Sequence, residues 1–124
     1  NKVQIVENKN NLERIEADAV LTKNNELALC VLTADCAPIL IYEEEKQIVG
    51  CIHSGWKGAV NGIIENTLKK IREIGGNIEK LVVCVGPCIA QKSYEVREDF
   101  YSIFIKKSKE NDSFFLKNNK KQRK

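Results

Sequence analysis

Two apolar runs joined by a short acidic stretch constrain the fold of this chain more than any other feature. The first run covers residues 38–42 and the second covers residues 47–52. Residues 43–46 between them read Glu-Glu-Glu-Lys. Two runs of strand length with so short a polar connection predict a β-hairpin with a loop of three to five residues.

A hairpin brings its two outer ends together, and each end of this one carries a reactive residue. Cys36 comes just before the first strand, and His53, the only histidine of the chain, comes just after the second. The two residues are seventeen positions apart in the sequence. We therefore predict that Cys36 and His53 lie close in space and form a functional site.

The remaining patterns predict one domain over residues 1–124, of the α/β or α+β class, with a mixed β-sheet flanked by helices. Further strands are expected at residues 3–6, 19–22, 27–32 and 81–85, the last two buried on both faces. Helices are expected at residues 60–74, ending at a glycine pair, and at residues 94–105. Residues 8–16 read as a polar loop, and beyond residue 106 no pattern is clear.

Composition excludes several classes of function. The longest apolar runs are about six residues, too short to cross a membrane. Five of the 20 basic residues lie in residues 117–124, which leaves 15 basic against 17 acidic residues elsewhere and no charge pattern for nucleic acid. The five cysteines are an odd number, and Cys30, Cys51 and Cys84 lie inside apolar runs, which favours buried free thiols in a reducing, cytoplasmic compartment.

A cysteine thiolate beside an imidazole allows two chemistries. One is nucleophilic catalysis with histidine as the base, and the other is a soft metal site that prefers zinc. Two ligands alone are fewer than zinc normally takes from a protein. Asp35 could orient the imidazole or accept a hydrogen bond from a ligand hydroxyl. All three residues also have ordinary structural interpretations, as turn, capping or packing residues.

The residues after His53 predict an anion site. Gly55, Lys57 and Gly58 come at the expected start of a helix, where backbone N–H groups and a cation favour phosphate. The glycines are equally explained by turn geometry, and Trp56 by packing. The sequence contains no Walker or dinucleotide-binding motif.

Four stretches together resemble one family, the multicopper polyphenol oxidases with a laccase domain, understood as zinc-dependent purine nucleoside phosphorylases that also deaminate adenosine. Some bacterial members are called peptidoglycan-editing factors. The stretches are Ala17-Asp18-Ala19-Val20-Leu21-Thr22, Thr33-Ala34-Asp35-Cys36-Ala37-Pro38-Ile39-Leu40, His53-Ser54-Gly55-Trp56-Lys57-Gly58, and Gly86-Pro87-Cys88-Ile89 continuing to Tyr94-Glu95-Val96.

The resemblance implies a layered fold similar to the Cys-His toxin hydrolases, with a zinc ion held by His, Cys and His. Cys36 and His53 match the second and third ligands. The first belongs to a Gln-Val-His motif expected just upstream of Val3, and the family's C-terminal part is expected after Lys124, so we expect this chain to be an internal fragment that turns over little substrate. Lys57 stands in place of the usual arginine, which loses bidentate geometry toward phosphate.

Further departures from the family pattern are Ser54 in place of alanine, and Ala90 and Ser93 where glycine and cysteine are common. The resemblance implies purine nucleoside and phosphate as partners, with adenosine, inosine, guanosine or methylthioadenosine as candidate nucleosides. Three alternatives stay open: a Cys36/His53 hydrolase or amidase acting on a peptidoglycan precursor, copper-dependent phenol oxidation, and a non-catalytic interaction module. Copper oxidation requires more histidines than this chain has.

Overall fold

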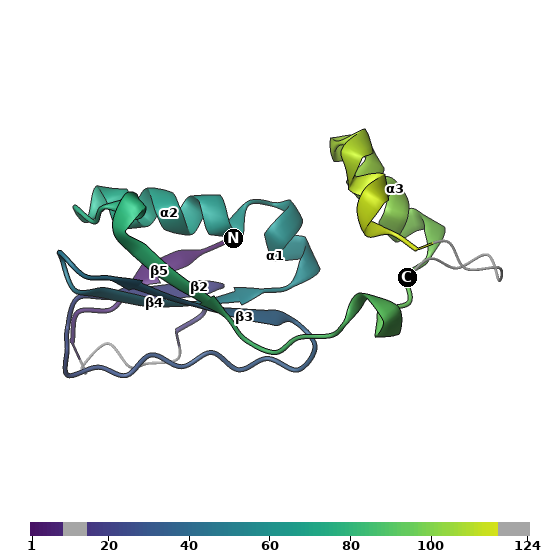
Figure 1. Ribbon diagram of the computed structural model, residues 1–124. Coiled ribbons are helices and arrows are strands. Elements are labelled where there is room, and N and C mark those ends of the chain that lie inside the picture. Colours follow the sequence, from purple (N-terminus) through teal and green to yellow (C-terminus); the bar gives the residue numbers. More distant parts are fainter. Residues whose placement is uncertain (9–14, 117–124) are drawn as a thin grey trace. The chain divides into compact units, whose positions relative to one another are not determined.

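Five of the six predicted strands form one mixed sheet, which confirms the predicted fold class (Figure 1). The computed structural model describes residues 1–8 and 15–116. The strands are β1 (Val3–Ile5), β2 (Ala19–Thr22), β3 (Ala37–Glu43), β4 (Ile48–Ser54) and β5 (Leu81–Val85). Their order in the sheet is β1-β2-β4-β3-β5. The β1–β2 pair is parallel and the other pairs are antiparallel.

The predicted hairpin is confirmed as β3 and β4. Its register pairs Glu43 with Ile48 at the turn and Pro38 with His53 at the open end. The buried Glu43 carboxylate stabilises the turn by accepting hydrogen bonds from the backbone N–H groups of Glu45 (3.3 Å) and Lys46 (2.8 Å). The turn is therefore held by a side chain of the strand that enters it.

The helix expected over residues 60–74 is two helices, which corrects that prediction. They are α1 (Trp56–Val60) and α2 (Ile63–Glu73). Gly62 separates them with a φ of +81°, a left-handed conformation that glycine adopts without strain. The expected stop is confirmed at Gly75, whose φ is +85°. Apolar spacing of three and four continues across the break, so periodicity alone does not reveal it.

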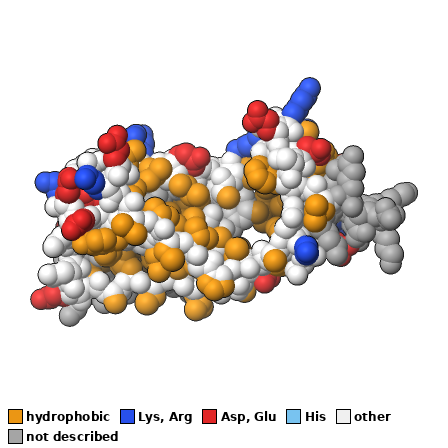
Figure 2. Space-filling view, in the orientation of Figure 1, with side chains coloured by type: hydrophobic (Ala, Val, Ile, Leu, Met, Phe, Trp, Pro, Cys, Tyr) orange, Lys and Arg blue, Asp and Glu red, His pale blue; other side chains and the backbone are white. Residues whose placement is uncertain are grey.

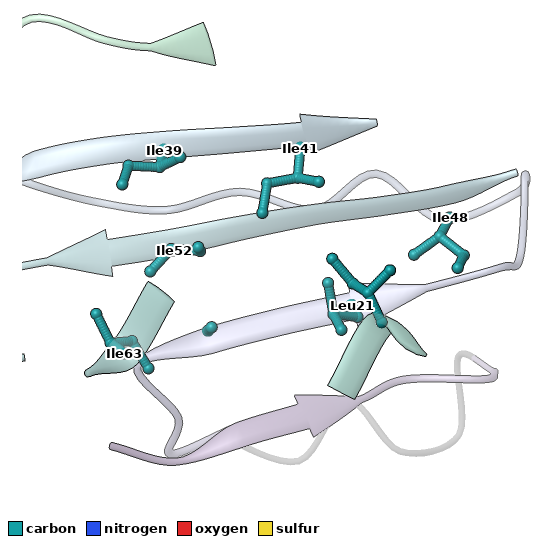
Figure 3. Packing of buried hydrophobic residues seen from close by; sticks show 8 residues of the cluster. Leu21, Ile39, Ile41, Ile48, Ile52 and Ile63 are labelled. Carbon is teal, nitrogen blue, oxygen red and sulfur yellow. The ribbon is translucent and has the colours of Figure 1, made fainter. Parts of the chain in front are cut away.

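The hydrophobic core lies between the sheet and α2, which covers one face (Figure 1). Strand alternation points one set of side chains toward the helix, and Ile63 and Ile71 of α2 meet them. Figure 3 shows six of these residues converging from β2, β3, β4 and α2. The buried cluster consists of Ala19, Leu21, Ile39, Ile41, Ile48, Ile52, Ile63 and Ile71.

Residues 27–32 do not form the buried strand that the sequence predicts. They run as an extended segment without strand pairing, along the face of the sheet opposite α2 (Figure 1). Leu32 is 94% exposed, and Cys30 is also exposed. The reason is that β2 and β3, the strands nearest in sequence, already have both of their ladder neighbours.

The strand predicted at residues 81–85 is confirmed as β5, but its expected burial on both faces is wrong. It is an edge strand, and Val82, Val83 and Val85 are more than half exposed. Figure 2 shows apolar side chains gathered on the surface over this part of the sheet. Cys84 is exposed as well, so of the three cysteines expected to be buried only Cys51 is. All described cysteines are free, as predicted.

Contacts divide the chain into two units, residues 1–88 and 89–124. The second unit contains α3 (Glu98–Lys107), which confirms the expected second helix although it begins four residues later than predicted, and the short 3-10 helix η4 (Lys109–Phe114). Aromatic rings pack inside this unit, with Phe100 5.7 Å from Tyr94 and 4.8 Å from Phe104 between ring centroids. Within the described residues, no helix is long and apolar enough to cross a membrane. The basic residues 117–124 and most of the expected polar loop lie outside the described part.

Candidate functional site

The open end of the hairpin brings Cys36 and His53 together. Cys36 comes directly before β3, and the register places Ala37 opposite Ser54 and Pro38 opposite His53. A Cβ atom placed on Gly55 would lie 3.2 Å from Cys36 Sγ and 3.7 Å from His53 Nε2. The thiol and the imidazole nitrogen therefore flank the same small space.

Gly55 keeps that space open. It precedes α1 in an extended conformation, with φ −73° and ψ 159°, which residues other than glycine also adopt. Its lack of a side chain matters for a different reason, because a Cβ atom at 3.2 Å from Sγ would be closer than an ordinary van der Waals contact. Glycine is used here for room and not for backbone freedom.

The backbone of β4 fixes where the imidazole points. The N–H of His53 donates to the carbonyl of Asp18, at 2.8 Å, where β2 begins. Successive side chains of a strand alternate between faces, so Ile52 packs into the core under α2 while Cys51 and His53 project to the other face. His53 is exposed and Cys36 is half-buried, so a ligand can reach both.

Asp18 is a further polar residue beside the site, and sequence reasoning did not select it. Its Oδ2 accepts from the backbone N–H of Lys2 at 2.7 Å and lies 3.4 Å from the terminal amine of Asn1. The Lys2 hydrogen bond, followed by the amine and the charge of His53, holds the pKa of the Asp18 carboxyl below its ordinary value. The sequence did contain a signal for Asp18, because it is an acidic residue directly before a predicted strand and lies in one of the four stretches that resemble the family.

The residues predicted for substrate and phosphate lie in α1 and in the turn before β3. Lys57 places its ammonium 5.5 Å from the ring centre of Trp56, a cation–π distance. Gly58 lies in α1, and its carbonyl accepts from the Asn1 side-chain amide at 3.3 Å. Asp35 is exposed in the turn before Cys36 and makes no hydrogen bond within the described residues. The helix start expected after Gly55 is present, although α1 has only five residues.

The donor atoms fit part of a zinc site. Thiolate sulfur and imidazole nitrogen are the ligands that zinc most often takes from proteins, and the space beside Gly55 is reached by one of each. Among the described residues, no group of three or more His, Cys, Asp and Glu side chains is arranged to hold a metal ion. The pair is therefore an incomplete set of ligands by itself.

Comparison with known proteins agrees with these features. A family model described as multi-copper polyphenol oxidoreductase laccase matches residues 1–124. The chain belongs to this family. The fold agrees too: the structure resembles a Neisseria meningitidis protein of solved structure with a TM-score of 0.74 at 27% identity, over 87% of this chain and 43% of that one. A Bacillus licheniformis protein gives a TM-score of 0.75 at 27% identity, over 86% and 41%.

Curated relatives in this family carry the name purine nucleoside phosphorylase. One from Rickettsia conorii is 43% identical over 101 residues, which cover 82% of this chain and 41% of the relative. One from Bacteroides thetaiotaomicron is 40% identical over 90 residues, which cover 72% and 33%. The chain thus spans less than half the length of these relatives.

Proposed function

We propose that this chain carries part of the active site of a zinc-dependent purine nucleoside phosphorylase, with Cys36 and His53 as two of the zinc ligands. The observation that carries the proposal is the convergence of Cys36 Sγ and His53 Nε2 on the space beside Gly55. The names of the relatives support the reaction, and the donor types support the metal. Free cysteines support a cytoplasmic location.

A third ligand is proposed to come from a histidine upstream of this chain in a longer parent protein. Asn1 lies beside the candidate site, since its amide donates to Gly58 and its amine lies 3.4 Å from Asp18 Oδ2. A residue immediately before Asn1 would therefore lie near Asp18 and Gly58. This agrees with the expected Gln-Val-His motif.

In the proposed reaction, the bond between C1′ of the ribose and N9 of the purine breaks and a phosphate oxygen bonds to C1′. The purine takes up a proton and leaves as the free base. Bound zinc would supply a Lewis acid. Lys57, with the backbone N–H groups near Gly55 and Gly58, would hold the phosphate, and Asp35 would orient a ligand group at the turn.

The proposal extends to the hydrolytic deamination of adenosine, in which water replaces the C6 amino group and ammonia leaves. Inosine, guanosine and methylthioadenosine are the other nucleosides we would assay. Deamination and phosphorolysis are separable because only phosphorolysis requires phosphate.

The test is Cys36→Ala, with Cys84→Ala as the control because Cys84 is also free but lies on β5. Both variants are made in this chain and in any longer protein that contains it, and zinc content is measured together with turnover of adenosine, inosine and phosphate. We expect Cys36→Ala to lower zinc affinity at least 100-fold and to abolish turnover, while Cys84→Ala changes neither. An active parent protein that is indifferent to Cys36→Ala would falsify the zinc hypothesis.

A second test uses the glycines. Gly55→Ala places a methyl group against both donor atoms, so we expect zinc affinity to fall by about tenfold or more, as for other changes that displace metal ligands. Gly58→Ala is the matched control, because its Cβ atom would find only ordinary contacts of 3.5 Å or more. Equal zinc affinities of the two variants in a competition titration would contradict the proposed site.

The same convergence favours one alternative, a thiol hydrolase or amidase in which His53 activates Cys36. That enzyme would label covalently at Cys36 with iodoacetamide whether or not zinc is present. Zinc coordination predicts the opposite result, since a metal-bound thiolate is protected from alkylation. The family's polyphenol oxidase name is tested in the same preparation by adding copper and following phenol oxidation.

A further inference from the structure

A cleft lies on the face of the sheet opposite α2, between residues 27–32 and strands β2 and β4. We call it the 27–32 cleft. It has a volume of about 360 Å³, within the range of small-molecule sites, about 300–1,000 Å³. Most of its lining is apolar, from residues 27–32 with Ala19 and Val20. An apolar slot of this size suits a flat heteroaromatic ring better than a phosphate or a metal ion.

Two polar residues of the cleft connect it to the candidate site. His53 lines the cleft and also reaches the space beside Gly55, because its side chain projects from β4 on the same face as Cys51. Asp18 lines the cleft as well. Both contacts of its carboxylate fall on Oδ2, and Oδ1 makes no hydrogen bond within the described residues. A carboxylate oxygen is an acceptor only, so Oδ1 suits a ligand hydroxyl.

We propose that the 27–32 cleft is the nucleoside subsite, with the purine base between the apolar segment and the sheet and a ribose hydroxyl donating to Asp18 Oδ1. This rests on the proposed function, because the ligand assigned to the cleft is the substrate of the proposed reaction. The ribose then lies at the end of the cleft nearest His53, where the reaction is proposed to occur. The extended apolar segment has a role in this arrangement as the outer wall of the subsite.

The wild-type chain contains its own probe and control for this subsite. Cys30 lines the cleft and Cys84 lies on β5, and both are exposed free thiols. The test uses a longer parent protein that contains this chain, because we expect the fragment alone to turn over little substrate. Iodoacetamide alkylation of each cysteine is followed by peptide mass spectrometry with and without inosine, in the absence of phosphate so that inosine is not consumed. We expect saturating inosine to slow alkylation of Cys30 at least fivefold and to change that of Cys84 less than twofold.

The outcomes separate this inference from the proposed function. Phosphorolysis of inosine with no protection of Cys30 at saturating inosine overturns the subsite and leaves the function intact. Protection of Cys30 without phosphorolysis supports the subsite and counts against the function. Absence of both rejects the two together.

The contribution of Asp18 is tested with nucleosides that lack one hydroxyl. Asp18→Asn keeps an oxygen that can accept from Lys2, so the fold is retained, and thermal melting checks this. We expect the wild-type chain to bind inosine about tenfold more tightly than 2′-deoxyinosine or 3′-deoxyinosine, and Asp18→Asn to lose that difference. An undiminished tenfold preference in the variant would rule out the proposed hydrogen bond.

Discussion

Residues 27–33 and 48–54 are two seven-residue segments that each begin with apolar residues and have a cysteine at the fourth position, but only one of them becomes a strand. Residues 48–54 become β4, hydrogen-bonded on one side to β2 and on the other to β3. Residues 27–33 pair with no strand in the described structure. Cys51 is 3% exposed, whereas Cys30 is exposed to solvent.

The difference teaches that apolar content favours burial but does not create a strand. A strand requires a neighbour whose N–H and C=O groups are unpaired, and β4 obtains one from the turn that folds it back on β3. Residues 27–33 are preceded and followed by turns that do not return them to an open edge. They cover the sheet through side chains alone and leave the 27–32 cleft beneath them.

The largest expected difference in stability is between a substitution in β4 and one in residues 27–33. Ile52→Ala removes a fully buried side chain of β4, and we expect a loss of about 4 kcal/mol in the free energy of unfolding. Leu32→Ala removes a side chain that is 94% exposed, so the expected loss is below about 0.5 kcal/mol. Urea denaturation followed by circular dichroism measures both, and a Leu32→Ala loss comparable to that of Ile52→Ala would contradict the exposed position of this side chain.

A smaller effect is expected at the turn that gives β4 its neighbour. Glu43→Ala removes the carboxylate that accepts from Glu45 and Lys46, and we expect a loss of about 2 kcal/mol because hydrogen bonds to charged groups are the stronger ones. Glu44→Ala is the control, since Glu44 is exposed at the same turn. Equal melting temperatures of the two variants would show that the buried Glu43 carboxylate does not stabilise the hairpin.

The smallest expected effect is the pH dependence that Asp18 confers where β1 and β2 meet β4. Its pKa in the folded state is lowered by the hydrogen bond from Lys2. The stabilisation is therefore present above the unfolded value of about 3.9 and is lost as the pH falls through the lower folded pKa. The side chain is 48% exposed, so solvent screening limits the stabilisation to about 0.5 kcal/mol.

Asp18→Asn should remove this part of the pH dependence. Denaturation at pH 6 and pH 3 measures it, with Asp35→Asn as the control because that carboxylate makes no hydrogen bond within the described residues. An Asp18→Asn variant with the same loss of stability on acidification as the wild-type chain would contradict the assignment.

Local patterns were enough to predict much of this molecule. Alternating and continuous apolar runs with turn residues between them specify the hairpin, and through it the meeting of Cys36 and His53, because a tight turn fixes the register of the two strands it joins. Spacing of three and four specifies the buried face of α2. Four short stretches identify the family, which the family model confirms.

Other features depended on the tertiary structure because they are decided by neighbours distant in sequence. Such contacts decide which apolar runs pair as strands and why β5 is an exposed edge. They also place Asp18 where its carboxylate accepts a hydrogen bond from Lys2, the residue before β1. The break at Gly62 was hidden because apolar spacing continues across it. The sequence by itself determined the hairpin and the two reactive residues at its open end, and only the tertiary structure decided which surfaces surround them, since surfaces are made by contacts that no local pattern records.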